Sequence, residues 1–186
     1  QSENQLWRVS LPDGAARRLT SDLNDHRIVS LTRDGRTLAS VSGDVSSTMS
    51  RLSLRGEARP RRLSRGRNDG LNGVAFGGGI FCTVGNNASI RRSADGVVWT
   101  QASNPPDAFA HFQWNSIVYA NGRFWTAGRN LSIASSADCD DWRLDYPAVP
   151  ILATDPVVGV FTDLSYGRIG GNDVLVAVGQ RPMTGT

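Results

Sequence analysis

The chain has 186 residues, of which 39% are hydrophobic, enough for one domain with a real core. No apolar run approaches the roughly 20 residues of a membrane-spanning helix, so we expect no membrane span. All 20 basic residues are arginine, and 15 of the 17 acidic residues are aspartate, with glutamate only at Glu3 and Glu57. The lysine and glutamate that favour long surface helices are therefore missing. The net charge of +3 is too mild to indicate a partner.

The cysteines and the first residue bear on the compartment. Cys82 falls in a predicted strand and Cys139 in a predicted turn, far apart in the sequence. Disulfide scaffolds carry many cysteines in a short chain, so we expect two free thiols here. The chain begins at Gln1 and shows no signal peptide, which indicates either a removed leader or an excised piece. A bacterial periplasmic or secreted location and a cytoplasmic one both stay open.

Short strands separated by turn signals fill the first third of the chain. Residues 5–11 alternate apolar and polar side chains and predict a half-exposed strand. Pro12-Asp13-Gly14 predicts a turn, after which residues 15–19 return as a second strand. The same signals predict four further strands, at residues 28–31, 37–41, 49–54 and 61–63.

The stretch 72–99 returns 43 residues later without a gap. The matched pairs include Asn72 and Asn115, Gly79 and Gly122, Phe81 and Phe124, Ser93 and Ser136, Asp95 and Asp138, and Trp99 and Trp142. The period reaches the first half as well, because Arg8-Val9-Ser10-Leu11 matches Arg51-Leu52-Ser53-Leu54 at the same offset. A period of about 40–45 residues is typical of one four-stranded propeller blade. The sequence therefore predicts an all-β propeller of four-stranded antiparallel blades.

This period divides the single domain, residues 1–186, into about four blades. Three blade-like units are expected at residues 27–64, 72–102 and 115–145. A fourth, at 160–186, lacks its outer hairpin, whereas residues 5–20 form an outer hairpin without inner strands. Pairing the N-terminal hairpin with the C-terminal strands would close the ring and hide two sheet edges. Pairing within one chain gives four blades and pairing between two chains gives a ring of eight; the tightness of a four-bladed ring favours a homodimer.

The two halves resemble different propeller repeats. Leu6-Trp7-Arg8-Val9 and Leu31-Thr32-Arg33-Asp34-Gly35 resemble the TolB-type or WD40-like repeat. Ser93-Ala94-Asp95-Gly96-Val97-Val98-Trp99 resembles the sialidase-like Asp box, and its second copy, residues 136–142, has lost the glycine. The resemblances imply a fold and no particular activity, because both families include enzymes, binders and scaffolds.

The Asp-box residues are expected to be structural. The resemblance implies that the carboxylates of Asp95 and Asp138 accept hydrogen bonds from backbone N–H groups and so lock an outer turn. It also implies that the tryptophans pack between sheets. The set comprises Ser93, Asp95, Trp99, Ser136, Asp138 and Trp142. The substrate-binding arginines and the nucleophilic tyrosine of sialidase-like enzymes have no match, so no catalytic role is carried over.

Polar residues precede the innermost strand of each blade. Asn72 and Asn115 share one blade position; the set also includes Asn24, Asp25, His26, Asn68, Asp69, His111, Gln113, Asp155 and Asp163. Oxygen side chains that converge on a propeller axis can bind a ligand or hold Ca²⁺, with Asp163, Asn72 and Asn115 as the candidate ligands. His26 or His111 is the candidate general base. The same residue types also serve as ordinary turn caps.

An arginine-rich segment at residues 51–67 bears on whether the chain binds nucleic acid. Seven arginines within 17 residues could bind phosphates: Arg51, Arg55, Arg59, Arg61, Arg62, Arg65 and Arg67. No aromatic residue is interleaved, which argues against nucleic acid and favours a solvated outer strand.

Two functions follow from these patterns. The first is a binding module that holds a small molecule or a protein and has no identifiable catalytic motif. The alternative is a Ca²⁺-dependent hydrolase of esters, lactones or phosphotriesters that acts at the propeller channel. A divalent ion that stabilises the protein would favour the alternative.

Overall fold

The computed structural model describes residues 5–20, 26–42, 48–53, 61–62, 70–103, 113–146 and 159–180. Within these ranges the chain is built of short strands, and no helix is long and apolar enough to cross a bilayer. The elements are β1 (Trp7–Val9), β2 (Ala16–Arg18), β3 (His26–Leu31), β4 (Thr37–Ser42), β5 (Thr48–Ser53), β6 (Arg61–Arg62), β7 (Leu71–Gly77), β8 (Ile80–Gly85), the 3₁₀ turn η1 (Asn86–Ala88), β9 (Ile90–Ser93), β10 (Thr100–Gln101), β11 (Trp114–Ala120), β12 (Arg123–Gly128), β13 (Ile133–Ser136), β14 (Arg143–Tyr146), β15 (Val160–Ile169) and β16 (Asn172–Gln180).

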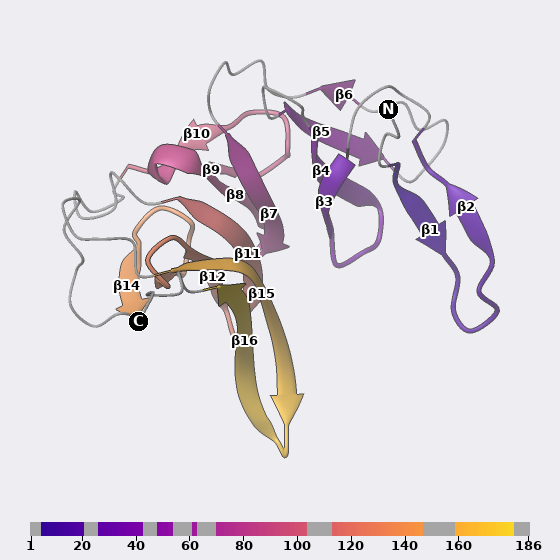
Figure 1. Cartoon of the computed structure of the whole chain (residues 1–186). Helices are drawn as coiled ribbons and strands as arrows, with labels where there is room; N and C mark the ends of the chain where they lie inside the picture. Colours follow the sequence, from indigo (N-terminus) through magenta and orange to yellow (C-terminus); the bar gives the residue numbers. More distant parts are fainter. Residues whose placement is uncertain are drawn as a thin grey trace.

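These strands form three four-stranded sheets, each a meander of consecutive antiparallel strands. Blade 1 is β3–β6, blade 2 is β7–β10 and blade 3 is β11–β14, and two separate hairpins, β1–β2 and β15–β16, flank them. The inner strands β3, β7, β11 and β15 lie side by side in that order. Figure 1 shows the two hairpins at opposite ends of the row. The all-β prediction and the four-stranded antiparallel sheets are confirmed.

Tight turns close the inner hairpins. Gly78-Gly79, Asn121-Gly122 and Gly170-Gly171 all have positive φ at both positions. This is the backbone that a two-residue type I′ hairpin turn requires, and glycine and asparagine adopt it at little cost. The same kind of turn therefore closes the inner hairpins of blades 2 and 3 and the last hairpin.

The largest core lies between blades 2 and 3. Trp114 and Phe124 of blade 3 are fully buried, and they pack in one cluster with Val84 and Ile90 of blade 2. Glycine also matters here, because a Cβ on Gly77 would overlap the ring of Tyr119. Burial of apolar side chains between sheets is the main force that holds neighbouring blades together.

The prediction of two free thiols is wrong. Cys82 in β8 and Cys139 in the turn after β13 form a disulfide, with Cα atoms 5.9 Å apart. Both residues are fully buried. Cys139 takes the repeat position of Gly96 and keeps its positive φ, 61° against 70°. The disulfide therefore joins two blades, and a separation of 57 residues hides this proximity in the sequence.

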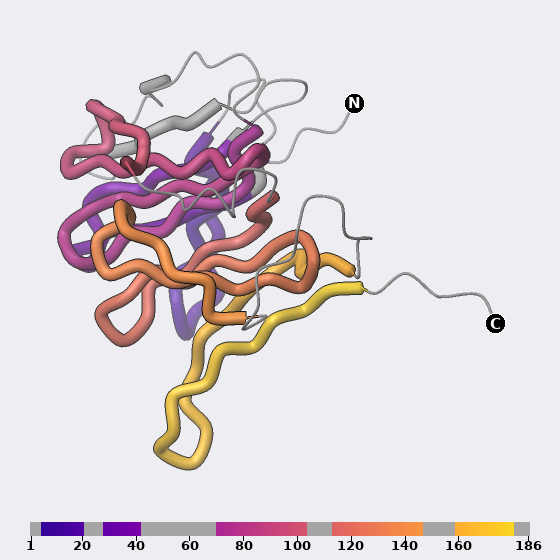
Figure 2. The backbone as a smooth tube through the Cα atoms, turned by 90° about the vertical axis from the view of Figure 1, so that its left-hand side faces the viewer, coloured from indigo at the N-terminus to yellow at the C-terminus, as the bar shows by residue number. Residues whose placement is uncertain are grey.

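The hairpins at the two ends of the row stay unpaired with each other. Among the described residues, β1–β2 and β15–β16 are separate two-stranded sheets, so the chain does not close on itself through them. The last hairpin is also long, with strands of ten and nine residues against seven and six in β11 and β12. Figure 2 shows it extending away from the stacked sheets.

Candidate binding site

Each inner strand begins with a register irregularity at the same place. The irregularities lie between His26 and Ile28, Leu71 and Gly73, Trp114 and Ser116, and Phe161 and Asp163. Asn72 and Asn115 occupy this position in blades 2 and 3. A bulge re-aims the side chain of the extra residue, and here it directs both amides toward the next blade.

The two asparagines hold neighbouring blades together. Asn72 Nδ2 donates to the carbonyl oxygen of Trp114 at 2.9 Å and to Asn86 Oδ1 at 3.0 Å. Asn115 Nδ2 donates to the carbonyl oxygen of Phe161 at 2.7 Å. Their amide donors are thus used within the protein, and a role in ligand binding stays a prediction.

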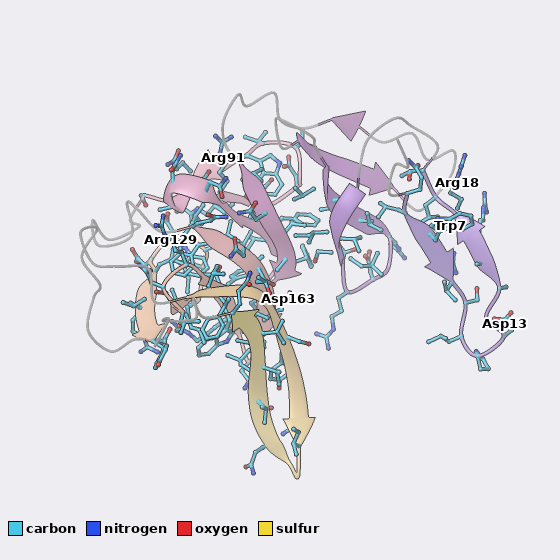
Figure 3. The ribbon with its side chains drawn as sticks, in the orientation of Figure 1. Trp7, Asp13, Arg18, Arg91, Arg129 and Asp163 are labelled. Carbon is cyan, nitrogen blue, oxygen red and sulfur yellow. A yellow bond between two sulfur atoms is a disulfide. The ribbon has the colours of Figure 1, made fainter. Side chains whose placement is uncertain are left out.

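Among the acidic residues and histidines of the channel set, Asp163 is the one whose side chain the structure describes. Asp163 accepts hydrogen bonds from Ser116 Oγ at 2.7 Å and from the N–H of Leu164 at 2.8 Å (Figure 3). His26 begins β3, but its side chain lies outside the described atoms, as do residues Asp25, Asp69 and His111 altogether. Across the described part of the chain, no three histidine, cysteine, aspartate or glutamate side chains are placed to hold a metal ion.

The two outer turns are locked by carboxylates. Asp95 Oδ1 accepts the N–H groups of Val97 and Val98 at 2.7 and 2.9 Å. Asp138 Oδ1 accepts those of Asp140 and Asp141 at 2.9 and 3.1 Å. The hydroxyls of Ser93 and Ser136 donate to the same two carboxylates at 3.1 and 3.0 Å.

These bonds change the acidity of both groups. The N–H groups of Val98 and Val97 hold the pKa of Asp95 below its usual value, because they stabilise the charged form. Burial raises the pKa of Asp138, but the N–H groups of Asp140 and Asp141, the Ser136 hydroxyl and the charge of Arg92 together lower it by more, so the net shift is also downward. The tryptophans that follow the turns belong to the clusters between blades: Trp142 is buried in that of blades 2 and 3, and Trp99 is partly buried against that of blades 1 and 2.

A neighbouring carboxylate adds a link that the sequence analysis missed. Asp140 Oδ1 accepts bonds from the backbone N–H and the hydroxyl of Ser103 at 2.7 and 2.8 Å, and Asp140 Oδ2 lies 2.9 Å from Arg92. Ser103 and Arg92 belong to blade 2, so the turn of blade 3 is fastened to it. No sequence pattern distinguishes this aspartate from an ordinary solvated turn residue.

The last hairpin borders a groove beside an open strand edge. β16 pairs only with β15, so among the described strands its other edge has no partner. A cavity of about 520 Å³ lies beside it, between the hairpin and the outer strands of blade 3. Its lining is mostly apolar or small: Leu131, Ile133, Tyr146, Phe161, Ala177 and Gly179, with Gln180 at one end.

The two faces of β16 differ in what covers them. Leu175 and Ala177 lie on the same face as Leu164, which is buried against blade 3. Val176 and Val178 lie on the opposite face and are 50% and 54% exposed. A continuous apolar run such as Val174–Val178 is typical of a strand covered on both faces. The apolar run is visible in the sequence, yet the face of β16 that carries Val176 and Val178 is exposed in the structure.

Comparisons with known proteins give the fold. No protein-family model matches the sequence, and no curated protein matches it. Among solved structures, a nidogen/laminin complex aligns with a TM-score of 0.65 at 14% identity, over 95% of this chain and 68% of that one. YCF48 bound to D1 peptide gives 0.62 at 16% identity, over 90% and 52%. The RRP9 WD40 repeats give 0.57 at 14%, over 75% and 44%.

These neighbours place the chain in a fold class. They are β-propellers, and the row of four-stranded sheets is a β-propeller arrangement. Another match, a structural genomics protein of unknown function from Bacteroides thetaiotaomicron VPI-5482, has a TM-score of 0.54 at 14% identity, over 75% of this chain. The chain spans only 38% of that protein's length. Identities this low show the fold alone.

Proposed function

We propose that this chain is a polypeptide-binding β-propeller module that takes up an extended strand at the free edge of β16. The observation that carries the proposal is a nine-residue strand whose second edge has no partner among the described strands and lies beside an apolar groove. Strand addition to such an edge uses backbone hydrogen bonds for affinity and side-chain pockets for specificity.

The edge lacks the usual protection against pairing. Natural edge strands carry lysine, proline or inward-pointing charges, or they are covered. β16 has no lysine and no proline, and its one charged residue, Asp173, lies at the far end beside Arg168. The centre of the strand is apolar on both faces, which suits a strand that gains a partner.

The groove has room for large side chains at alternate positions of the added strand. Ala177 and Gly179 lie two residues apart on the groove side of β16, and both are small. The opposite wall carries Tyr146, which is 50% exposed, and Ile133. Alternate residues of an added strand point to one face, so an aromatic or branched side chain of the ligand would fill this space.

Two of the structural neighbours support binding as the class of function. One was solved as a nidogen/laminin complex and another with a bound D1 peptide. No described residue favours the hydrolase over this proposal, so we put forward one function.

We also infer that the locked outer turns belong to the Asp-box type and that ring closure takes place at the β16 edge.

The proposal is tested by hydrogen exchange on dilute protein. The probe is a six-residue peptide that alternates threonine and valine; its matched control carries N-methyl groups on alternate backbone amides, which removes hydrogen-bond donors. We expect the first peptide to slow amide exchange in β16 and the control to leave it unchanged. Equal exchange with and without the first peptide would overturn the proposal.

A further inference from the structure

We infer that the strand taken up at the β16 edge is β1 of a second copy of this chain. This inference rests on the proposed function and names its partner. Each copy would insert its β1–β2 hairpin beside the β15–β16 hairpin of the other, so that two half-blades become one four-stranded blade.

The β1–β2 hairpin has the features of the missing ligand. β1 pairs only with β2, so it too has an open edge among the described strands. Trp7 and Val9 share one face of β1 and are 58% and 56% exposed (Figure 3). A large aromatic and a branched residue at alternate positions are what the groove beside Ala177 and Gly179 has room for.

The internal repeat supplies a register for the pairing. Gly179, Gly128, Gly85 and Ser42 each lie opposite the residue that precedes the inner-strand irregularity. A Cβ on Gly128 would overlap the carbonyl oxygen of Gln113, just before β11, and one on Gly179 that of Val160 at the start of β15, which supports the equivalence of these two. Counting back from this position, Leu175 corresponds to Leu38, Phe81 and Phe124, all of which are buried.

Transfer of the β4–β5 register then places specific residues together. In blade 1, Leu38 lies opposite Leu52 and Ser40 opposite Ser50. Residues 8–11 match residues 51–54 at the 43-residue offset, so Val9 falls opposite Leu175 and Trp7 opposite Ala177. Both side chains then point into the groove, on the face that lies against blade 3.

A second surface is covered in the same step. Val29 and Leu31 of β3 are 50% and 49% exposed, and they lie on the face opposite Ile28, which packs toward blade 2. Val176 and Val178 of β16 are the bare apolar face at the other end of the row. Within the chain each inner strand packs on the next, and docking of β15–β16 on β3 of the second copy repeats that contact.

The arrangement uses two chains because, among the described strands of one chain, the two hairpins lie at opposite ends of the row and do not pair (Figure 1). Each contact joins two different surfaces, which is a head-to-tail interface that either closes into a ring or grows into a fibre. Among its described strands, each copy supplies three four-stranded sheets and two hairpins that complete each other. Two copies joined by both contacts would bring eight four-stranded blades into one ring.

Sedimentation equilibrium of the 186-residue chain measures this directly. We expect twice the 20.0 kDa mass of one chain, with a melting temperature that rises with protein concentration. Trp7→Asp should halve the mass and leave the circular dichroism spectrum unchanged, because Trp7 is exposed within one chain. Val98→Asp is the matched control: Val98 is 67% exposed on blade 2, and this variant should keep the doubled mass.

Mixing experiments test the head-to-tail geometry. Val176→Asp alters the other half of the contact, and alone it should also give the single-chain mass. A mixture of Trp7→Asp and Val176→Asp proteins keeps one intact contact per pair, so part of the doubled mass should return. A single-chain mass for the unaltered protein, or open aggregates of many chains, would overturn the inference. If the unaltered chain is monomeric and the threonine–valine peptide still protects β16, the inference fails and the proposed function stands.

Discussion

Removal of the disulfide between Cys82 and Cys139 is the perturbation whose size follows most directly from the structure. The bond closes a loop of 57 residues across two blades. In the chain-entropy model, closing a loop of that length lowers the conformational entropy of the unfolded chain. This stabilises the folded state by about 4 kcal/mol at 25 °C. Cys82→Ser combined with Cys139→Ser should therefore lower the free energy of unfolding by an amount of that order.

The backbone at Cys139 refines the prediction. Its φ of 61° is left-handed, a region that costs a non-glycine residue roughly 1–2 kcal/mol. Both Cys139→Gly and Cys139→Ala remove the bond, but glycine also removes this strain, as Gly96 does in blade 2. In a Cys82→Ser background, the glycine variant should be more stable than the alanine variant by about 1 kcal/mol.

Equilibrium urea unfolding measures both differences, with a thiol titration of the unaltered protein under native conditions as the companion assay. The unaltered protein should release no free thiol until it is unfolded and reduced. Two titratable thiols, or a destabilisation below about 1 kcal/mol for the double serine variant, would refute the inter-blade link.

Three further perturbations test the blade contacts. Trp142→Ala should cost about 3–5 kcal/mol in urea unfolding, and Trp99→Ala less, because Trp99 is only partly buried; equal losses would contradict this. Asn115→Ala should cost about 1 kcal/mol, because a carbonyl of the next strand loses its donor, and no change would show that the bond is unimportant. Asp95 and Asp138 have lowered pKa values, so they stabilise the fold above the unfolded pKa and lose that contribution as the pH falls below about 4. Thermal melts of the two Asp→Asn variants should therefore decline less steeply in acid than those of the parent, and identical slopes would count against the carboxylate locks.

The repeat made most of the sheet architecture predictable. Strand pairs are local, and Asn121-Gly122 or Gly78-Gly79 between alternating apolar runs specifies a hairpin turn by backbone conformation alone. The predicted strands at 28–31 and 37–41 accordingly fall within β3 and β4 as observed. These features depend only on residues close in sequence.

Contacts between blades could not be predicted in the same way. The disulfide depends on how β8 of one sheet faces a turn of the next, which no local pattern encodes. The reach of Asn115 to the carbonyl of Phe161 depends likewise on the placement of a neighbouring strand. The apolar run Val174–Val178 is typical of a covered strand, but a local pattern does not say what covers it.

We propose that the edge of β16 binds a strand, and in solution that of a second copy. Hydrogen exchange of the β16 amides across a range of protein concentrations measures this pairing in the intact chain. We expect strong protection of this strand in concentrated protein, lost on dilution and absent from Trp7→Asp at every concentration. Exchange in β16 that is the same at all concentrations, and the same in the variant, would contradict the uptake of β1 from a second copy.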